Sequence, residues 1–230
     1  MAIYAAQIDR MDQGIGKVME ALKRNGYEED TLVMFLSDNG ACHEAGTLGT
    51  NFRPDLDGEL GSVNSYQSYG LSWSNASNTP FRKHKSWVHE GGIATPLIVH
   101  WPGNIADPGT ITHQTGHIID MMATCCDVAG IDYPQQYNGN EIKPLEGKSL
   151  TPIFRGRERE PHELLYWEHF GNRALRQGKW KLVEDAQEQR WELYDMEADR
   201  TETHDLIDQL PEHAEALKKC YSDWAERIGV

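Results

Sequence analysis

Residues 31–40 read TLVMFLSDNG, a run of apolar side chains that stops abruptly at Asp38, Asn39 and Gly40. β-Branched and aromatic residues in a run of this length, bounded by polar residues and glycine, predict a buried strand of a parallel sheet. Because open α/β sheets bind ligands at the carboxyl ends of their strands, Asp38 and Asn39 are candidate site residues. A carboxylate and a neutral amide oxygen suit Ca²⁺ or Mg²⁺ better than zinc. Taken alone, however, this sequence is more typical of an ordinary turn.

Composition limits the classes of function. The 230-residue chain can form one good core, and its length permits one domain or two small ones. Acidic residues outnumber basic ones 36 to 22, and the net charge of −14 argues against a general nucleic-acid binder, which needs clustered Lys and Arg. The four cysteines show no C-x-x-C spacing and predict neither a zinc ribbon nor a disulfide framework. We find no signal peptide and no apolar run near the roughly 18 residues of a membrane span.

The first two thirds of the chain alternate helix and strand patterns. Apolar residues at helical spacing predict an amphipathic helix over residues 2–25, leading into the strand at 31–37. Residues 95–101 predict a second strand, and residues 117–130 a further helix that ends at a glycine. This order is typical of an α/β fold. Between the strands, residues 41–85 lack periodicity and form a candidate substrate-facing loop, with a disordered surface excursion as the alternative.

The last third of the chain has a different pattern of apolar residues, with shorter runs. Ser149 is expected to cap a short helix. Short apolar runs over residues 164–195, separated by glycine or polar residues, predict an antiparallel meander. Residues 211–228 predict a final amphipathic helix that begins with proline. We therefore predict an α/β domain over residues 1–155 and a C-terminal subdomain over residues 156–230.

A second candidate constellation lies at residues 80–92, which read PFRKHKSWVHEGG. Basic side chains crowd just before Gly91 and Gly92, where a backbone without Cβ atoms can approach another group closely. A concentration of cations in an acidic protein is expected to attract an anionic ligand. Taken alone, a surface cluster that balances acidic neighbours is the better supported interpretation.

Several short motifs occur in order along the chain. They are DRMDQGIG at 9–16, FLSDNG at 35–40, Lys85 followed by Glu90-Gly91-Gly92, PLIVHWPG at 96–103, DMMAT at 120–124, GKSL at 147–150 and WELYD at 191–195. This order resembles the later part of a type I sulfatase, and it is most similar to the bacterial arylsulfatase group. The resemblance covers essentially the whole chain.

The resemblance implies an alkaline-phosphatase-like α/β sheet with helices, incomplete at its N-terminus, followed by a small subdomain of antiparallel strands and a helix. It implies a hydrolase that cleaves sulfate esters with a formylglycine nucleophile and one Ca²⁺. Asp38 and Asn39 match two metal ligands of the family, and Lys85 matches its sulfate-binding lysine. The chemistry agrees, because a divalent cation polarises sulfate oxygens and an ammonium group stabilises negative charge as the ester bond breaks. Lys83 and His84 match no functional position.

The chain also departs from the family pattern. The C/S-x-P-x-R motif that carries the nucleophile is absent, as are the aspartates that complete the calcium site. Met1 fits an internal methionine of the family. We therefore expect the C-terminal part of a sulfatase, inactive as an isolated chain, whose partner is the missing N-terminal half of the catalytic domain. A truncated gene product, a split gene and a remnant all remain open.

Two other classes of function are alternatives. The chain could be a noncatalytic binding or assembly module, or a phosphatase or phosphodiesterase relative. The second is disfavoured by Asn39, since a two-metal phosphoesterase is expected to carry a zinc-binding histidine there. The sequence does not separate small sulfated substrates from sulfated glycans, and His169 in the meander is a weak candidate for contact with a substrate. Periplasmic or extracellular localisation is an expectation from the resemblance alone.

Overall fold

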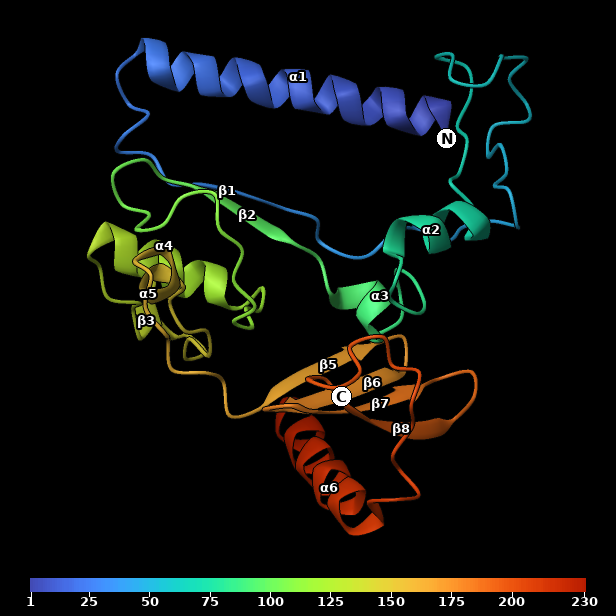
Figure 1. Ribbon diagram of the computed structural model, residues 1–230, viewed down its shortest axis with the longest axis vertical. Helices are drawn as coiled ribbons and strands as arrows, with labels where there is room; N and C mark the ends of the chain where they lie inside the picture. Colours follow the sequence, from blue (N-terminus) through green and yellow to red (C-terminus); the bar gives the residue numbers. More distant parts are fainter. The chain divides into compact units, whose positions relative to one another are not determined.

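The computed structural model describes residues 1–230 (Figure 1). These residues fall into two compact units. Unit 1 consists of Met1–Val18, Leu36–Leu97 and Glu163–Val230, and unit 2 of Met19–Phe35 and Ile98–His162. These units are groupings by contact. The predicted domain division after residue 155 stays a prediction.

The core of unit 1 is built on a four-stranded antiparallel sheet in the order β5-β6-β7-β8. Its strands are β5 (Leu165–His169), β6 (Asn172–Gln177), β7 (Trp180–Asp185) and β8 (Arg190–Asp195). Leu182 of β7 pairs with Leu175 on one side and Leu193 on the other, and all three side chains are fully buried. The meander predicted for residues 164–195 is therefore confirmed.

Both faces of this sheet are covered. Helix α6 (Pro211–Ile228) packs against one face through Ala214, Leu217 and Tyr221, as Figure 1 shows. The opposite face carries Ala174, Val183, Tyr194 and Met196, which pack around the buried side chain of Val88. Val88 lies just before the short helix α3 (Glu90–Ile93), so the segment rich in basic residues is attached to the sheet by apolar contacts.

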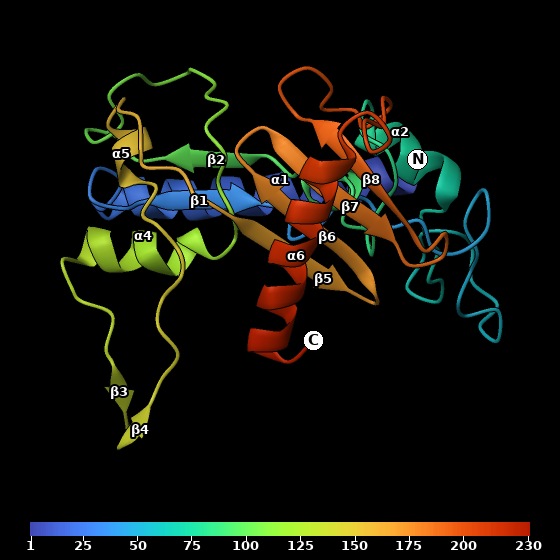
Figure 2. The same ribbon diagram turned by 90° about the horizontal axis from the view of Figure 1, so that it is seen from below.

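The strands predicted at residues 31–37 and 95–101 form a two-stranded sheet of β1 (Val33–Leu36) and β2 (Leu97–His100). The strands run in opposite directions (Figure 2), in agreement with hydrogen bonds from Gly40 N–H to Gly92 O and from Thr95 Oγ1 to Ser37 O, both 2.9 Å. The expectation of a parallel sheet is wrong for this pair, because an apolar run does not encode strand direction. The strands are not fully buried either, since Phe35 is 40% and Ile98 60% exposed.

The helices predicted from periodicity are present. Helix α1 (Ala2–Arg24) has no buried residue, and Ile8, Met11 and Val18 on it are exposed. Helix α4 (Asp120–Ala129) ends at Gly130, which adopts the left-handed conformation with φ 65°. The predicted short helix is α5 (Thr151–Phe154), but its N-cap residue is Leu150 and no side chain caps it, so the expectation that Ser149 is the cap is wrong. Ser149 Oγ accepts the Thr151 N–H at 3.1 Å from one position further upstream. No helix combines the length and apolar character needed to cross a membrane.

Three small elements were not predicted. One is helix α3, whose four residues are too few to show a helical pattern. Helix α2 (Leu71–Asn78) lies within the segment of residues 41–85, where its serine and asparagine side chains conceal a helical pattern. A hairpin of β3 (Gln136–Tyr137) and β4 (Asn140–Glu141) lies in the segment before α5. Its strands are too short to give an alternating pattern.

Unit 2 is held together around the buried carboxylate of Asp120 at the start of α4. This carboxylate accepts backbone N–H groups of His117 and Lys148, both at 2.8 Å, and contacts Arg159 at 2.9 Å and His162 at 2.7 Å. Burial alone would raise the pKa of Asp120, but these hydrogen bonds hold it below its ordinary value. The network ties α4 to the segment that leads out of unit 2.

Leu182→Ala should destabilise unit 1. The side chain is completely buried between α6 and the sheet, so its truncation leaves a cavity and should lower the free energy of unfolding by about 2–5 kcal/mol. Urea denaturation followed by tryptophan fluorescence measures this change. Ile228→Ala, on the half-exposed end of α6, is the control and should cost less than about 0.5 kcal/mol. Equal losses for the two variants would contradict this description of the core.

Candidate functional site

Asp38 and Asn39 lie in the turn that follows β1. Asp38 is exposed and Asn39 is half-buried, and neither side chain makes a hydrogen bond within the chain. The turn is held instead through its backbone, since Ser37 Oγ donates to Asn39 O at 2.8 Å. A carboxylate and an amide oxygen are therefore available to an external ligand.

Glycines bring this turn against the second constellation. Gly40 N–H donates to Gly92 O at 2.9 Å, and a Cβ atom added to Gly40 would lie only 1.7 Å from Gly91 O. A Cβ atom on Gly92 would lie 1.9 Å from Trp87 O. No side chain fits at such distances, so larger residues at these positions would force the backbones apart. The prediction that the diglycine permits a close backbone approach is confirmed.

Lys85 is attached to the same turn. Its backbone N–H donates to Ala41 O at 3.1 Å, two residues after Asn39. Asn78, at the end of α2, reinforces the attachment, because its Oδ1 accepts Ala41 N–H and its Nδ2 donates to Lys83 O, both at 3.0 Å. Asn78 was missed in the sequence because nothing local marks a side chain that bridges two distant segments.

The cations of residues 82–85 differ in their partners. Arg82 donates to Tyr194 Oη at 2.8 Å and lies 3.6 Å from Glu192, and Lys83 Nζ lies 2.6 Å from Asp185. Carboxylates of the four-stranded sheet therefore neutralise the charges of Arg82 and Lys83. A structural role for Lys83 agrees with its lack of any match to a functional position.

Lys85 forms no ion pair with a carboxylate, although its charge acts on the neighbouring loop. A hydrogen bond from Cys42 and then the charge of Lys85 lower the pKa of Glu44. The charged Lys85 ammonium group is therefore close enough to act on residues 42 and 44. It is the cation of this segment that is available to an anionic ligand.

His84 belongs to the interior. Its Nδ1 is 3.0 Å from Ser74 Oγ, and its ring stacks on that of His43 with centroids 5.6 Å apart. Burial, followed by electrostatic interaction with His43 and Lys83, lowers the pKa of His84. A buried imidazole of this kind supports the backbone next to Lys85.

A buried ionic network fixes the Glu90 end of the segment. Lys181 Nζ lies 2.8 Å from Glu90 Oε1 and 2.7 Å from Glu202 Oε1, and Glu202 Oε2 accepts the Glu90 N–H at 2.8 Å. Lys181 and Glu202 are 0% and Glu90 5% exposed. We call these residues the Lys181 triad. The triad was not predicted, because a lysine inside a strand pattern is normally solvent-exposed.

The charges of the triad stabilise one another. Burial alone would lower the pKa of Lys181, but Glu202 and Glu90 hold it above its ordinary value. Burial would likewise raise the pKa of Glu90, and the nearby Lys181 holds it below its ordinary value of 4.5. Lys181 and Glu90 are therefore charged at neutral pH, and their ion pair anchors α3 to the sheet.

The donor set of the site fits calcium, although it is not a full set. Asp38 and Asn39 provide hard oxygen ligands, whereas Ca²⁺ takes about 6–8. Among the described residues, no three His, Cys, Asp or Glu side chains gather in a way that could hold a metal ion. The two residues can supply part of a calcium site and no more.

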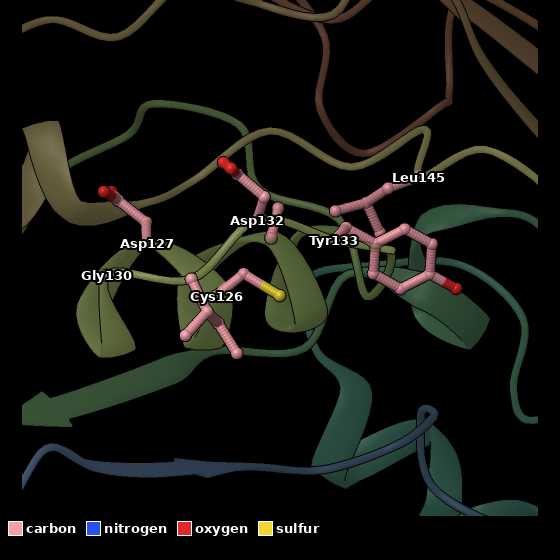
Figure 3. Close-up of a pocket in the computed structure, with 8 residues that line it drawn as sticks. Cys126, Asp127, Gly130, Asp132, Tyr133 and Leu145 are labelled. Atoms are coloured by element: carbon pink, nitrogen blue, oxygen red, sulfur yellow. The ribbon is translucent and has the colours of Figure 1, made fainter. Parts of the chain in front are cut away.

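A surface pocket of 330 Å³ lies elsewhere, beside the end of α4 in unit 2 (Figure 3). It is lined by Cys126, Asp127, Asp132, Tyr133 and Leu145, among others. Its two carboxylates come from α4 and from the loop that follows, and no cation lines it. The pocket therefore lacks a positive charge to attract an anion, and it contains none of the predicted site residues.

Comparison with known proteins identifies the class. The Sulfatase family model matches residues 1–131, and the model described as N-sulphoglucosamine sulphohydrolase, C-terminal, matches residues 81–226. An arylsulfatase of Klebsiella aerogenes is 36% identical over 160 residues, covering 66% of this chain and 34% of the relative. A Schizosaccharomyces pombe sulfatase is 30% identical over 100% of this chain and 44% of its own length.

Solved structures agree on the fold. Ps i-CgsB in complex with k-i-k-neocarrahexaose is 25% identical with a TM-score of 0.69, covering 96% of this chain and 42% of that one. BT1596, a 2-O GAG sulfatase, gives a TM-score of 0.59 at 21% identity, with 94% of this chain and 41% of that one covered. These findings define an α/β protein with the alkaline-phosphatase-like fold of sulfatases. The chain belongs to the sulfatase family, and it spans less than half the length of these relatives.

Lys181→Met should release α3 from the sheet. The variant removes the buried cation shared by Glu90 and Glu202 and leaves only Arg200, 3.8 Å from Glu90, as an ion-pair partner, which should lower the free energy of unfolding by about 3–5 kcal/mol at neutral pH. Wild type loses the contribution of Glu90 as the pH falls through the lowered pKa of this group. In the variant a carboxylate can instead take up a proton, so the difference should shrink as the pH falls toward 4.5.

Urea denaturation across this pH range measures the difference. Lys179→Met is the matched control, because the Lys179 side chain, which pairs with Asp195, is 41% exposed, and it should cost less than about 1 kcal/mol. A loss for Lys181→Met that is equally small, or that grows as the pH falls, would contradict the charged triad.

Proposed function

We propose that this chain supplies the calcium-binding and sulfate-binding side of an enzyme that hydrolyses sulfate esters. Asp38 and Asn39 would hold Ca²⁺, and Lys85 would bind the sulfate group. One observation carries the proposal: two unengaged oxygen ligands and one unpaired ammonium group lie on segments joined by the Gly40 to Gly92 and Lys85 to Ala41 hydrogen bonds. Membership of the sulfatase family supports the same chemistry.

The charges suit this reaction. Calcium, when bound, would polarise the sulfate oxygens. The Asp38 carboxylate would contribute negative charge to the ion's ligand set, and Asn39 would add a neutral oxygen. The Lys85 ammonium group would stabilise the negative charge that develops as the ester bond breaks. A formylglycine nucleophile would have to come from residues outside this chain, because no C/S-x-P-x-R sequence is present.

We propose that the substrate is a sulfated small molecule or a sulfated glycan. The neocarrahexaose complex of Ps i-CgsB and the complex of BT4656 with D-glucosamine-2-N,6-O-disulfate support the glycan class. Similarity of fold does not by itself decide the reaction, since a phosphonate monoester hydrolase of Agrobacterium radiobacter has a TM-score of 0.59 at 20% identity. Asn39 favours sulfate chemistry, because an amide oxygen suits calcium and not zinc.

We further propose that the partner of this chain is the remaining part of a sulfatase catalytic domain. Helix α1 has no buried residue, and the strand residues Phe35 and Ile98 are exposed. These apolar surfaces are what a larger α/β domain would cover. Two calcium ligands without the others, and no nucleophile, predict that the isolated chain does not turn over substrate. Inhibitor-sensitive hydrolysis of an aryl sulfate by the chain alone would contradict this.

Asp38→Ala should weaken calcium binding. We expect the chain to bind Ca²⁺ only in the millimolar range, since it supplies few ligands, and the amide signals of residues 38–41 should shift on titration in NMR spectra. Asp57→Ala, which removes another exposed carboxylate of unit 1, should leave the titration unchanged. The assignment fails if Asp38→Ala and wild type give the same calcium-dependent shifts.

The isolated chain should self-associate through its uncovered strands. Sedimentation velocity should show concentration-dependent oligomers, and Ile98→Thr should reduce them by removing apolar surface from a residue that is 60% exposed. Val63→Thr, at a loop position that is 99% exposed, is the control and should have no effect. A monomer with one cooperative unfolding transition would argue against an uncovered surface.

A further inference from the structure

The turn between β5 and β6 is anchored to the residue that follows Lys85. Asn172 Nδ2 donates to Ser86 O at 3.0 Å and to His169 O at 3.1 Å, and its Oδ1 accepts the Ala186 N–H at 3.1 Å. Asn172 is 7% exposed, so these bonds are protected from water. In Figure 1 this end of the hairpin lies beside the segment that leads into α3. The turn and Lys85 are therefore held in the same part of unit 1.

The turn itself carries an unexpected residue. His169 pairs with Asn172, and the two central residues, Phe170 and Gly171, have φ values of 53° and 81°. A two-residue turn with both φ values positive is of type I′, which strongly favours Asn-Gly. The β3–β4 hairpin of this protein follows that rule with Asn138-Gly139, at 50° and 79°. An aromatic residue in the left-handed conformation is the less stable choice.

The unfavourable backbone conformation of Phe170 is not offset by packing of its side chain into the core. It is 79% exposed, and its ring lies 4.1 Å, centroid to centroid, from the ring of His169. A singly exposed apolar side chain needs no explanation. An exposed aromatic pair on a strained, anchored turn is different, because strain at a fixed position is typical of groups that contact ligands.

We infer that Phe170, with His169, is a platform that binds the sugar ring of a sulfated substrate whose sulfate group contacts Lys85. This inference rests on the proposed function and names its substrate class. Aromatic faces pack well against the C–H face of a pyranose, and an open platform leaves the sugar hydroxyls in water. Because Arg82 and Lys83 are neutralised by the sheet, Lys85 offers one cation for one sulfate group.

Phe170→Asn separates binding from folding. Asparagine is the favoured residue at this turn position, so the variant should melt at the same temperature as wild type or higher, while the aromatic ring is lost. Titrations followed by NMR, with galactose 6-sulfate and with inorganic sulfate as probes, measure binding to the 230-residue chain. We expect the Kd for galactose 6-sulfate to rise about 2- to 10-fold and that for sulfate to stay unchanged. Tyr137→Ala, which removes a 68% exposed aromatic from β3, should change neither.

Each other outcome has a definite meaning. If Phe170→Asn binds galactose 6-sulfate as tightly as wild type does, or binds both probes more weakly by the same factor, then Phe170 does not bind the sugar ring. If 4-nitrophenyl sulfate depends on Phe170 and galactose 6-sulfate does not, the sugar assignment is wrong. If wild type does not bind inorganic sulfate, the proposed function of Lys85 fails, and that result is obtained separately from any variant of Phe170.

Discussion

The arrangement of the site depends on one buried cation. Lys181 projects from the four-stranded sheet and lies 2.8 Å from Glu90 and 2.7 Å from Glu202, both of which are buried. Because Glu90 begins α3, its position fixes the diglycine that follows it. The diglycine in turn accepts the hydrogen bond from Gly40. A charge inside the C-terminal sheet thus holds the turn that carries Asp38 and Asn39.

The same sheet also decides which cation is free. In this sheet, Glu192 forms an ion pair with Arg82, and Asp185 forms one with Lys83. Lys85 has no carboxylate partner. An acidic protein with a net charge of −14 can in this way present one isolated positive group next to two oxygen ligands. The four-stranded sheet therefore contributes to the proposed site, because its ion pairs leave Lys85 as the cation that would bind the anion.

Much of this could be predicted from the sequence, and the exceptions have a common cause. Periodicity located α1, α4, α6 and the meander, and the end of an apolar run located Asp38 and Asn39, because these signals are local. Strand direction and the Lys181 to Glu90 contact, 91 residues apart, depend on tertiary packing, which no local pattern encodes. The hydrogen bonds by which Asn78 links Ala41 to Lys83 were missed for the same reason. The assignment of Lys85 came from resemblance, and its lack of a partner was visible only in the structure.

The most direct test compares two neighbouring lysines. Inorganic sulfate should be titrated into the wild-type chain, Lys85→Ala and Lys83→Ala, with binding followed by NMR. We predict that Lys85→Ala loses sulfate binding and that Lys83→Ala keeps it, since Lys83 is already paired with Asp185. Loss of binding in Lys83→Ala together with retention in Lys85→Ala would contradict the account of which cation the fold leaves free.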